Sequence, residues 1–171
     1  MIGVLTEMKA LKVIFAGGGT GGHLFPALAI AERLKLVQKS AVIKFIGTKK
    51  GIEGKIIPDS DFDFLPIWIS GISRENNLLL TILKNLLFPF KLMIATAQSF
   101  WFLLRQKPDA VIGTGGFVSG PPLYVATLLG IPTLIHEQNS YPGLTTRLLA
   151  GRVDRILLSY EECTKYLKKK V

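Results

Sequence analysis

Short apolar runs alternate with longer helical patterns along the whole chain, and this alternation limits the fold more than any other feature. Runs typical of strands lie at residues 12–15, 42–46, 64–69, 110–112, 133–135 and 155–158. Helical patterns lie at residues 24–36, 78–88, 92–105 and 121–129, after Pro142-Gly143, and at 161–168. Strands that alternate with helices pair in parallel and carry helices on both faces. The sequence therefore predicts one doubly wound α/β domain over residues 1–171, with ligands at the carboxyl ends of the strands.

Composition narrows the function classes. At 171 residues and 49% hydrophobic content, the chain suits one domain with a buried core rather than a disordered segment. The net charge of +9 favours an anionic membrane, a phosphorylated ligand or a nucleic acid. Aromatic residues do not alternate with basic ones, so nucleic acid is not expected. The single cysteine, Cys163, provides no disulfide or thiolate metal site, and residues 1–10 lack the long apolar run of a signal peptide.

A first glycine-rich loop, Gly17–His23, follows the first predicted strand and opens a helix, with Pro26 expected in the first helical turn. Such a loop lets the backbone approach a ligand, and its N–H groups and the helix dipole favour an anion. The glycines also match the dinucleotide pattern G-x-G-x-x-G. However, the second strand ends in residues 47–50, which include no carboxylate for a ribose, and no Lys-Ser/Thr pair completes a P-loop. An ordinary tight turn remains the alternative.

Two more loops follow later strands. Residues 113–122 repeat the strand–glycine–helix design, with Ser119 expected as the helix N-cap. The two glycine loops predict two anion sites that face one crevice. The third loop, residues 136–139, contains four consecutive polar side chains, which suit either a surface loop or the mouth of that crevice. Both histidines, His23 and His136, lie in these loops, and a group that titrates near neutrality suits general base catalysis.

The segment 78–104 is rich in Leu, Phe, Ile and Trp, but polar residues and Pro89 interrupt it. We expect no run of the roughly 20 apolar residues that span a bilayer. One or two helices, buried or lying on a surface, are predicted instead. Residues 78–91 are more apolar than a helix packed on one face requires, so an exposed apolar patch is a second interpretation beside a core role.

Taken together, the motifs of these loops resemble the MurG family. They are residues 18–23 (GGTGGH), Pro26-Ala27, residues 113–121 (GTGGFVSGP) and residues 136–139 (HEQN), in that order and spacing. The resemblance covers about residues 11–167. It implies a Rossmann-like doubly wound parallel sheet that forms the amino-terminal, acceptor-binding half of a GT-B glycosyltransferase. The implied reaction moves N-acetylglucosamine from UDP-N-acetylglucosamine to undecaprenyl diphosphate-N-acetylmuramoyl-pentapeptide, with inversion, at the cytoplasmic face of the bacterial cell membrane.

The resemblance also implies roles for individual residues. Thr20 and His23 match positions near the reacting groups, although the residues do not identify the base. The implied substrate-binding set is Gly18, Gly19, Thr20, Gly21, Gly22, His23, Gly115, Gly116, Phe117, Ser119, His136, Glu137, Gln138 and Asn139. The implied membrane-facing set is Leu79, Leu83, Lys84, Leu87, Phe88 and Lys91. No cofactor is required, and a divalent metal is compatible with the sequence but not indicated by it.

Two departures from the family pattern carry expectations of their own. Phe117 stands where the family usually has Tyr, so a hydroxyl contact is missing. The chain also ends at Val171, so we expect the carboxy-terminal donor domain to be absent and the chain alone to be inactive. The alternative function is a non-catalytic, acceptor-binding and membrane-anchoring subunit of a two-chain N-acetylglucosamine transferase. A third interpretation is an unrelated nucleotide-binding protein.

Overall fold

Six parallel strands form one sheet in the order β3-β2-β1-β4-β5-β6. The computed structural model describes residues 10–73 and 76–167. The strands are β1 (Lys12–Gly17), β2 (Val42–Gly47), β3 (Asp63–Pro66), β4 (Ala110–Gly115), β5 (Thr133–Glu137) and β6 (Arg155–Leu158). The strand order reverses between β1 and β4, and this is the place where doubly wound sheets bind their ligands. The predicted fold class is confirmed.

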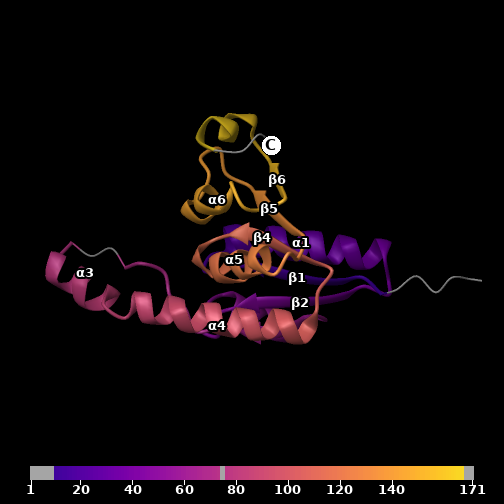
Figure 1. Cartoon of the computed structure of the whole chain (residues 1–171), viewed down its shortest axis with the longest axis horizontal. Coiled ribbons are helices and arrows are strands. Elements are labelled where there is room, and N and C mark those ends of the chain that lie inside the picture. Colours follow the sequence, from indigo (N-terminus) through magenta and orange to yellow (C-terminus); the bar gives the residue numbers. More distant parts are fainter. Residues whose placement is uncertain (1–9, 74–75, 168–171) are drawn as a thin grey trace, which may run out of the picture.

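Helices cover both faces of the sheet (Figure 1). The α-helices are α1 (Gly21–Val37), α2 (Glu53–Ile56), α3 (Leu78–Asn85), α4 (Phe88–Gln106), α5 (Gly120–Leu128) and α6 (Leu144–Leu149). Three short 3-10 helices are η1 (Ile57–Asp59), η2 (Phe117–Ser119) and η3 (Glu161–Tyr166). Figure 1 shows α4 lying along the body of the domain, whereas α3 extends beyond it.

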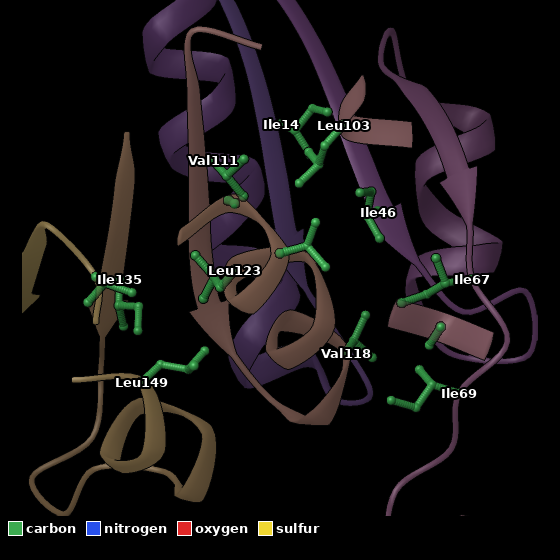
Figure 2. Packing of buried hydrophobic residues seen from close by; sticks show 14 of the residues in the cluster. Ile14, Ile46, Ile67, Ile69, Leu103, Val111, Val118, Leu123, Ile135 and Leu149 are labelled. Atoms are coloured by element: carbon green, nitrogen blue, oxygen red, sulfur yellow. The ribbon is translucent and has the colours of Figure 1, made fainter. Parts of the chain in front are cut away.

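Alternation along the strands sends side chains into two separate core clusters. In β1, Phe15 belongs to the cluster that contains Leu24 of α1. Its neighbour Ile14 belongs to the cluster that contains Leu103 of α4 and Leu123 of α5 (Figure 2). Removing these apolar side chains from water is the main force that holds each helix on its face. The carboxyl ends of β1 and β4 are thereby held between two packed layers.

Three local expectations were wrong. Because α1 begins at Gly21, Pro26 lies beyond the first helical turn, inside the helix. Strand β3 ends at Pro66 rather than residue 69: the Ile67 N–H still donates to the Gly47 carbonyl of β2 (2.8 Å), and the Trp68 N–H then donates to Oε1 of Gln98 in α4 (2.7 Å). The predicted last helix is the 3-10 helix η3, and α2 was not predicted at all. Residues 1–9 and the lysines at 168–170 lie outside the described residues.

The apolar segment forms α3 and α4, close to the two predicted helices. The helical stretch Leu79–Gln106 is long and apolar enough to cross a membrane by length and composition alone, contrary to expectation, and only 6% of its most apolar 18 residues are buried. One such stretch is weak evidence for a span. The inner face of α4 packs on the domain through Ala95, Ser99 and Leu103. The outer face remains uncovered.

Candidate functional site

The first two predicted loops meet at the reversal point of the sheet. Gly17 at the end of β1 pairs with Gly115 at the end of β4. The buried Thr114 hydroxyl donates to the main-chain carbonyl oxygen of His23 (2.7 Å), which ties β4 to the first turn of α1. A Cβ atom on Gly116 would lie 2.4 Å from the carbonyl oxygen of Gly18. The two loops therefore approach each other closely, and this approach requires glycine.

His23 lies in the first turn of α1, and its ring lies against Gly115. A Cβ on Gly115 would lie 2.7 Å from Cδ2 of His23, 3.2 Å from Nε2 of His23 and 3.8 Å from Nε2 of Gln138. Gly115 also has a φ of +99°, which glycine adopts readily. This position is therefore where His23 from the first loop and Gln138 from the third loop come together.

A hydrogen bond orients the His23 ring. Nδ1 of His23 lies 2.9 Å from Oγ1 of Thr20, the exposed residue that precedes α1. When Nδ1–H donates to Thr20, Nε2 retains the lone pair that a general base needs. Burial lowers the pKa of His23 below its ordinary value, although the Glu137 charge and the Gly18 backbone oppose the shift. This shift favours the neutral form of His23, which can accept a proton.

A buried carboxylate holds the first glycine loop. Glu53 is 1% exposed, and its Oε2 accepts the N–H of Gly19 (2.9 Å). Its Oε1 accepts the N–H and the hydroxyl of Thr48 (2.9 and 2.7 Å). The Gly19 N–H thus points at an internal anion rather than at a ligand, contrary to expectation. Sequence reasoning missed Glu53, although a lone acid among Lys49, Lys50 and Lys55 was a signal.

Hydroxyl groups hold the second glycine loop. Ser119 is the N-cap residue of α5, as expected, but its buried hydroxyl donates to the Gly116 carbonyl (3.0 Å) and accepts no helix N–H. Thr145 donates to the same carbonyl (2.9 Å). The ring of Phe117 fills the space over two glycines: Cβ atoms on Gly19 and Gly71 would lie 2.8 and 3.0 Å from it. Phe117 therefore joins the first loop to the segment after β3 by packing.

Glu137 organises the third loop. Its side chain is 2% exposed, and Oε1 accepts the main-chain and side-chain N–H groups of Asn139 (3.2 and 2.8 Å). Oε2 accepts the Gly143 N–H (3.0 Å) and the Thr146 hydroxyl (2.7 Å). The carboxylate is therefore occupied by protein donors. Glu137 thus fixes the positions of Asn139, Gly143 and Thr146.

The residues on either side of Glu137, His136 and Gln138, have unpaired polar atoms. His136 lies on β5 rather than in the loop, with Nε2 3.5 Å from the Ser159 hydroxyl. Within the described part of the chain, Nδ1 of His136 and Oε1 of Gln138 are buried and have no hydrogen-bond partner. Buried polar atoms in native proteins are nearly always paired, so these two atoms are candidate contacts for a ligand.

Many exposed apolar side chains lie along α3 and α4. They are Leu79, Leu80, Ile82, Leu83, Leu86, Leu87, Phe90, Leu92, Met93, Phe100, Trp101 and Leu104, which we call the α3–α4 surface. Of the predicted membrane-facing set, Leu79, Leu83 and Leu87 belong to it, whereas Phe88 is half-buried. The side chain of Lys84 lies outside the described residues. Lys91 is half-buried, and its ammonium group contacts Ser70 (3.1 Å).

Among residues 10–73 and 76–167, no group of three or more His, Cys, Asp or Glu side chains is arranged to hold a metal ion. The thiol of the single cysteine, Cys163, is buried against the Asn139 carbonyl, and this burial raises its pKa.

Known proteins resemble this chain in sequence over most of its length. The family model described as the glycosyltransferase family 28 N-terminal domain matches residues 13–158. A protein of Thermoanaerobacter sp. (strain X514), named UDP-N-acetylglucosamine--N-acetylmuramyl-(pentapeptide) pyrophosphoryl-undecaprenol N-acetylglucosamine transferase, is 47% identical over 94% of this chain. The chain spans only 43% of that protein's length.

Solved structures resemble the fold as well. The crystal structure of Acinetobacter baumannii MurG superposes with a TM-score of 0.72 at 33% identity, over 90% of this chain and 42% of that one. The Streptomyces sp. SF2575 glycosyltransferase SsfS6 superposes with a TM-score of 0.57 at 18% identity, over 83% of this chain and 44% of that one. The second similarity concerns the fold alone.

Proposed function

The chain belongs to glycosyltransferase family 28, as an N-terminal domain of that family, and we propose that it is the acceptor-binding half of a hexosyltransferase. The transferred group is N-acetylglucosamine from UDP-N-acetylglucosamine. The acceptor is the lipid-linked precursor undecaprenyl diphosphate-N-acetylmuramoyl-pentapeptide, so the reaction belongs to peptidoglycan synthesis. The relative from Thermoanaerobacter, which is named for this transfer, supports the assignment. The donor half lies outside residues 1–171, in a further domain or a partner chain.

The meeting of His23 and Gln138 over Gly115, with Thr20 hydrogen-bonded to the His23 ring, is the observation that carries the proposal. Nε2 of His23 accepts the proton of the acceptor hydroxyl, and the hydroxyl oxygen attacks the anomeric carbon as the bond to UDP breaks. Thr20 holds the ring by its Nδ1. The amide oxygen of Gln138 and Nδ1 of His136, which have no hydrogen-bond partner in the described part of the chain, bind polar groups of the acceptor sugar. Burial, which lowers the pKa of His23, favours the neutral form that a general base needs.

A hybrid protein tests the assignment. Residues 1–171 are joined to the carboxy-terminal half of the Thermoanaerobacter relative, and transfer from UDP-N-acetylglucosamine to a lipid-linked acceptor is measured. We expect the chain alone to be inactive, since both substrates must be held in register. In an active hybrid, His23→Ala should lower kcat by about 10²- to 10⁴-fold, with the thermal midpoint within a few degrees. Normal turnover in His23→Ala, or turnover by residues 1–171 alone, would contradict the proposal.

The two-chain alternative is tested with the same parts. If the donor half restores transfer when it is added in trans at micromolar concentration, the chain works as a subunit. If only the covalent hybrid is active, the two halves belong to one polypeptide.

We propose that the α3–α4 surface binds the cytoplasmic face of the membrane peripherally. An exposed apolar surface of this extent marks an interaction site, and a substrate with a polyprenyl tail must be met at a bilayer. The overall charge of +9 adds attraction to anionic lipid. The contact should weaken at high salt, because exposed charges are screened over about 8 Å at physiological ionic strength.

Vesicle co-sedimentation measures this contact. Leu79→Ser with Leu83→Ser, at positions 64% and 56% exposed, should release most of the protein from phosphatidylglycerol vesicles. A matched control, Leu36→Ser with Leu148→Ser, alters two side chains that are each 70% exposed on other elements, and it should leave binding unchanged. Equal binding by both double variants would place the membrane contact elsewhere.

A further inference from the structure

Residues 19–23 need support from outside the segment to keep the His23 ring in one place. Three of these five residues are glycines, and glycine leaves the main chain freer than any other residue. Thr20 stands at the N-cap position of α1, yet its side chain accepts no helix N–H; its Oγ1 lies instead 2.9 Å from Nδ1 of His23. The helix end that carries the proposed base therefore lacks the usual side-chain cap.

A buried carboxylate holds the first end of this segment. Oε2 of Glu53 accepts the Gly19 N–H (2.9 Å), and Oε1 accepts the N–H and the hydroxyl of Thr48. A Cβ on Gly18 or on Gly51 would lie 2.5 Å from an atom of the carboxylate group. The main chain of two loops thus encloses Glu53, which is 1% exposed and too deeply buried to meet a substrate.

A buried hydroxyl holds the other end. Thr114 is fully buried, and its Oγ1 donates to the main-chain carbonyl oxygen of His23 itself (2.7 Å). Thr114 immediately precedes Gly115, against which the His23 ring lies. A Cβ on Gly17 would collide with the Thr114 hydroxyl, so the glycine at the end of β1 leaves room for this contact. His23 is therefore fixed to β4 through its main chain as well as through its ring.

The two supports come from opposite sides of β1. Residues 19–23 follow β1, whose neighbours in the sheet are β2 and β4. Glu53 begins α2, the helix that follows β2, and Thr114 lies on β4. Because the sheet fixes β2 and β4 relative to β1, buried side chains from both neighbours can hold a flexible segment in register with the crevice.

We propose that Glu53 and Thr114 are positioning residues for the proposed base, which hold residues 19–23 from the two strands beside β1. The inference rests on the proposed function, because it takes His23 as the base. A base must lie within hydrogen-bond reach of the hydroxyl that it deprotonates, and a displacement of about 1 Å can cost roughly 10²-fold in rate. Loss of either contact should lower kcat and leave KM nearly unchanged, since no substrate contact is removed.

Thr114→Val is the sharper test, because valine keeps the branched shape and removes only the hydroxyl. In the hybrid protein described above, we expect kcat to fall about tenfold or more, with the thermal midpoint within a few degrees. Ser99→Ala is the matched control: its hydroxyl is also fully buried and donates to a helical carbonyl, that of Ala95 (2.7 Å), but in α4. It should cost similar stability at normal kcat. Equal kcat in the two variants would overturn the role of Thr114.

A double substitution tests whether the two residues hold the same segment. Glu53→Gln should lower kcat by about 10²-fold when it is assayed well below its thermal midpoint. Glu53→Gln combined with Thr114→Val should lower kcat by less than the product of the two single effects, because the first loss already frees the segment. A combined effect equal to that product would show that the residues act independently, which overturns the shared role.

An NMR titration of the 171-residue chain gives a readout that requires no turnover. The chain has two histidines, so the signal of His136 serves as an internal reference. Burial lowers the pKa of His23, and the Glu137 charge opposes this shift. Thr114→Val changes no charge, so a freed and more exposed His23 should show a pKa closer to its ordinary value, whereas Ser99→Ala should not change it.

The outcomes separate this proposal from the proposed function. If His23→Ala loses turnover in the hybrid but the His23 titration is unchanged in Thr114→Val, the positioning role is wrong and the assignment of the base stands. If His23→Ala retains normal turnover, the base assignment is wrong and the positioning role falls with it.

Discussion

The two glycine-rich loops follow the same sequence design but are held in opposite ways. In the first loop, a main-chain N–H of Gly19 donates to the buried carboxylate of Glu53. In the second loop, the carbonyl of Gly116 accepts from the hydroxyls of Ser119 and Thr145. The first loop therefore has a negative charge beneath it and one fewer donor to offer, whereas the hydroxyl contacts of the second loop use only an acceptor. Two loops with the same glycine pattern need not bind the same ligand group.

The largest effect is expected where the loops touch. Gly116→Ala places a Cβ 2.4 Å from the Gly18 carbonyl oxygen, at a φ of +76°. Main chain cannot move aside as a flexible side chain can, so the free energy of unfolding should fall by about 3 kcal/mol. Gly22→Ala is the matched control, since its Cβ meets nothing closer than 3.8 Å. Urea unfolding measures both. Equal losses in the free energy of unfolding of the two variants would show that the close approach of the loops does not require glycine at position 116.

The next effect tests whether the Glu53 carboxylate holds the first loop, as hydroxyl groups hold the second. Glu53→Gln keeps the shape but turns an amide N–H₂ toward the Gly19 or Thr48 donors. The free energy of unfolding should fall by about 2 kcal/mol, and exchange of the Gly19 amide proton should accelerate. Glu32→Gln, at an exposed position on α1, is the control and should change little. Retained protection of the Gly19 amide in Glu53→Gln would mean that the carboxylate does not hold the loop.

The smallest effect concerns His23, which the two loops enclose. Burial lowers its pKa in the folded chain below the 6.5 of an ordinary histidine. Between the folded pKa and 6.5, the unfolded chain binds more protons, so stability should rise with pH. The contribution of neutral His23 is fully present above pH 6.5 and is lost as the pH falls through the folded pKa. His23→Gln should therefore reduce the difference in urea midpoint between pH 5 and pH 8. An unchanged difference in urea midpoint would show that groups other than His23 cause the pH dependence of stability.

Local patterns were enough to predict all six strands and the order of loops along the chain. Apolar runs bounded by glycine or proline mark strands because a parallel sheet buries both of its faces. The boundaries that were missed depend on distant partners. Strand β3 stops where Gln98 of α4 takes the Trp68 N–H, a contact 30 residues away in sequence. Likewise, the early start of α1 places Pro26 inside the helix, at a position that the motif alone did not reveal.

The sequence by itself determined the sheet, the two glycine loops, the positions of both histidines and the family resemblance, because these depend on residue types at short, regular spacing. Only the tertiary structure decided which polar atoms remain free to meet a ligand. Glu53 and Glu137 are both acidic residues near strand ends, yet folding buries each one against donors from its own loops. A buried carboxylate must be satisfied by nearby N–H and O–H groups. Which groups those are depends on the packing of segments that are far apart in the chain.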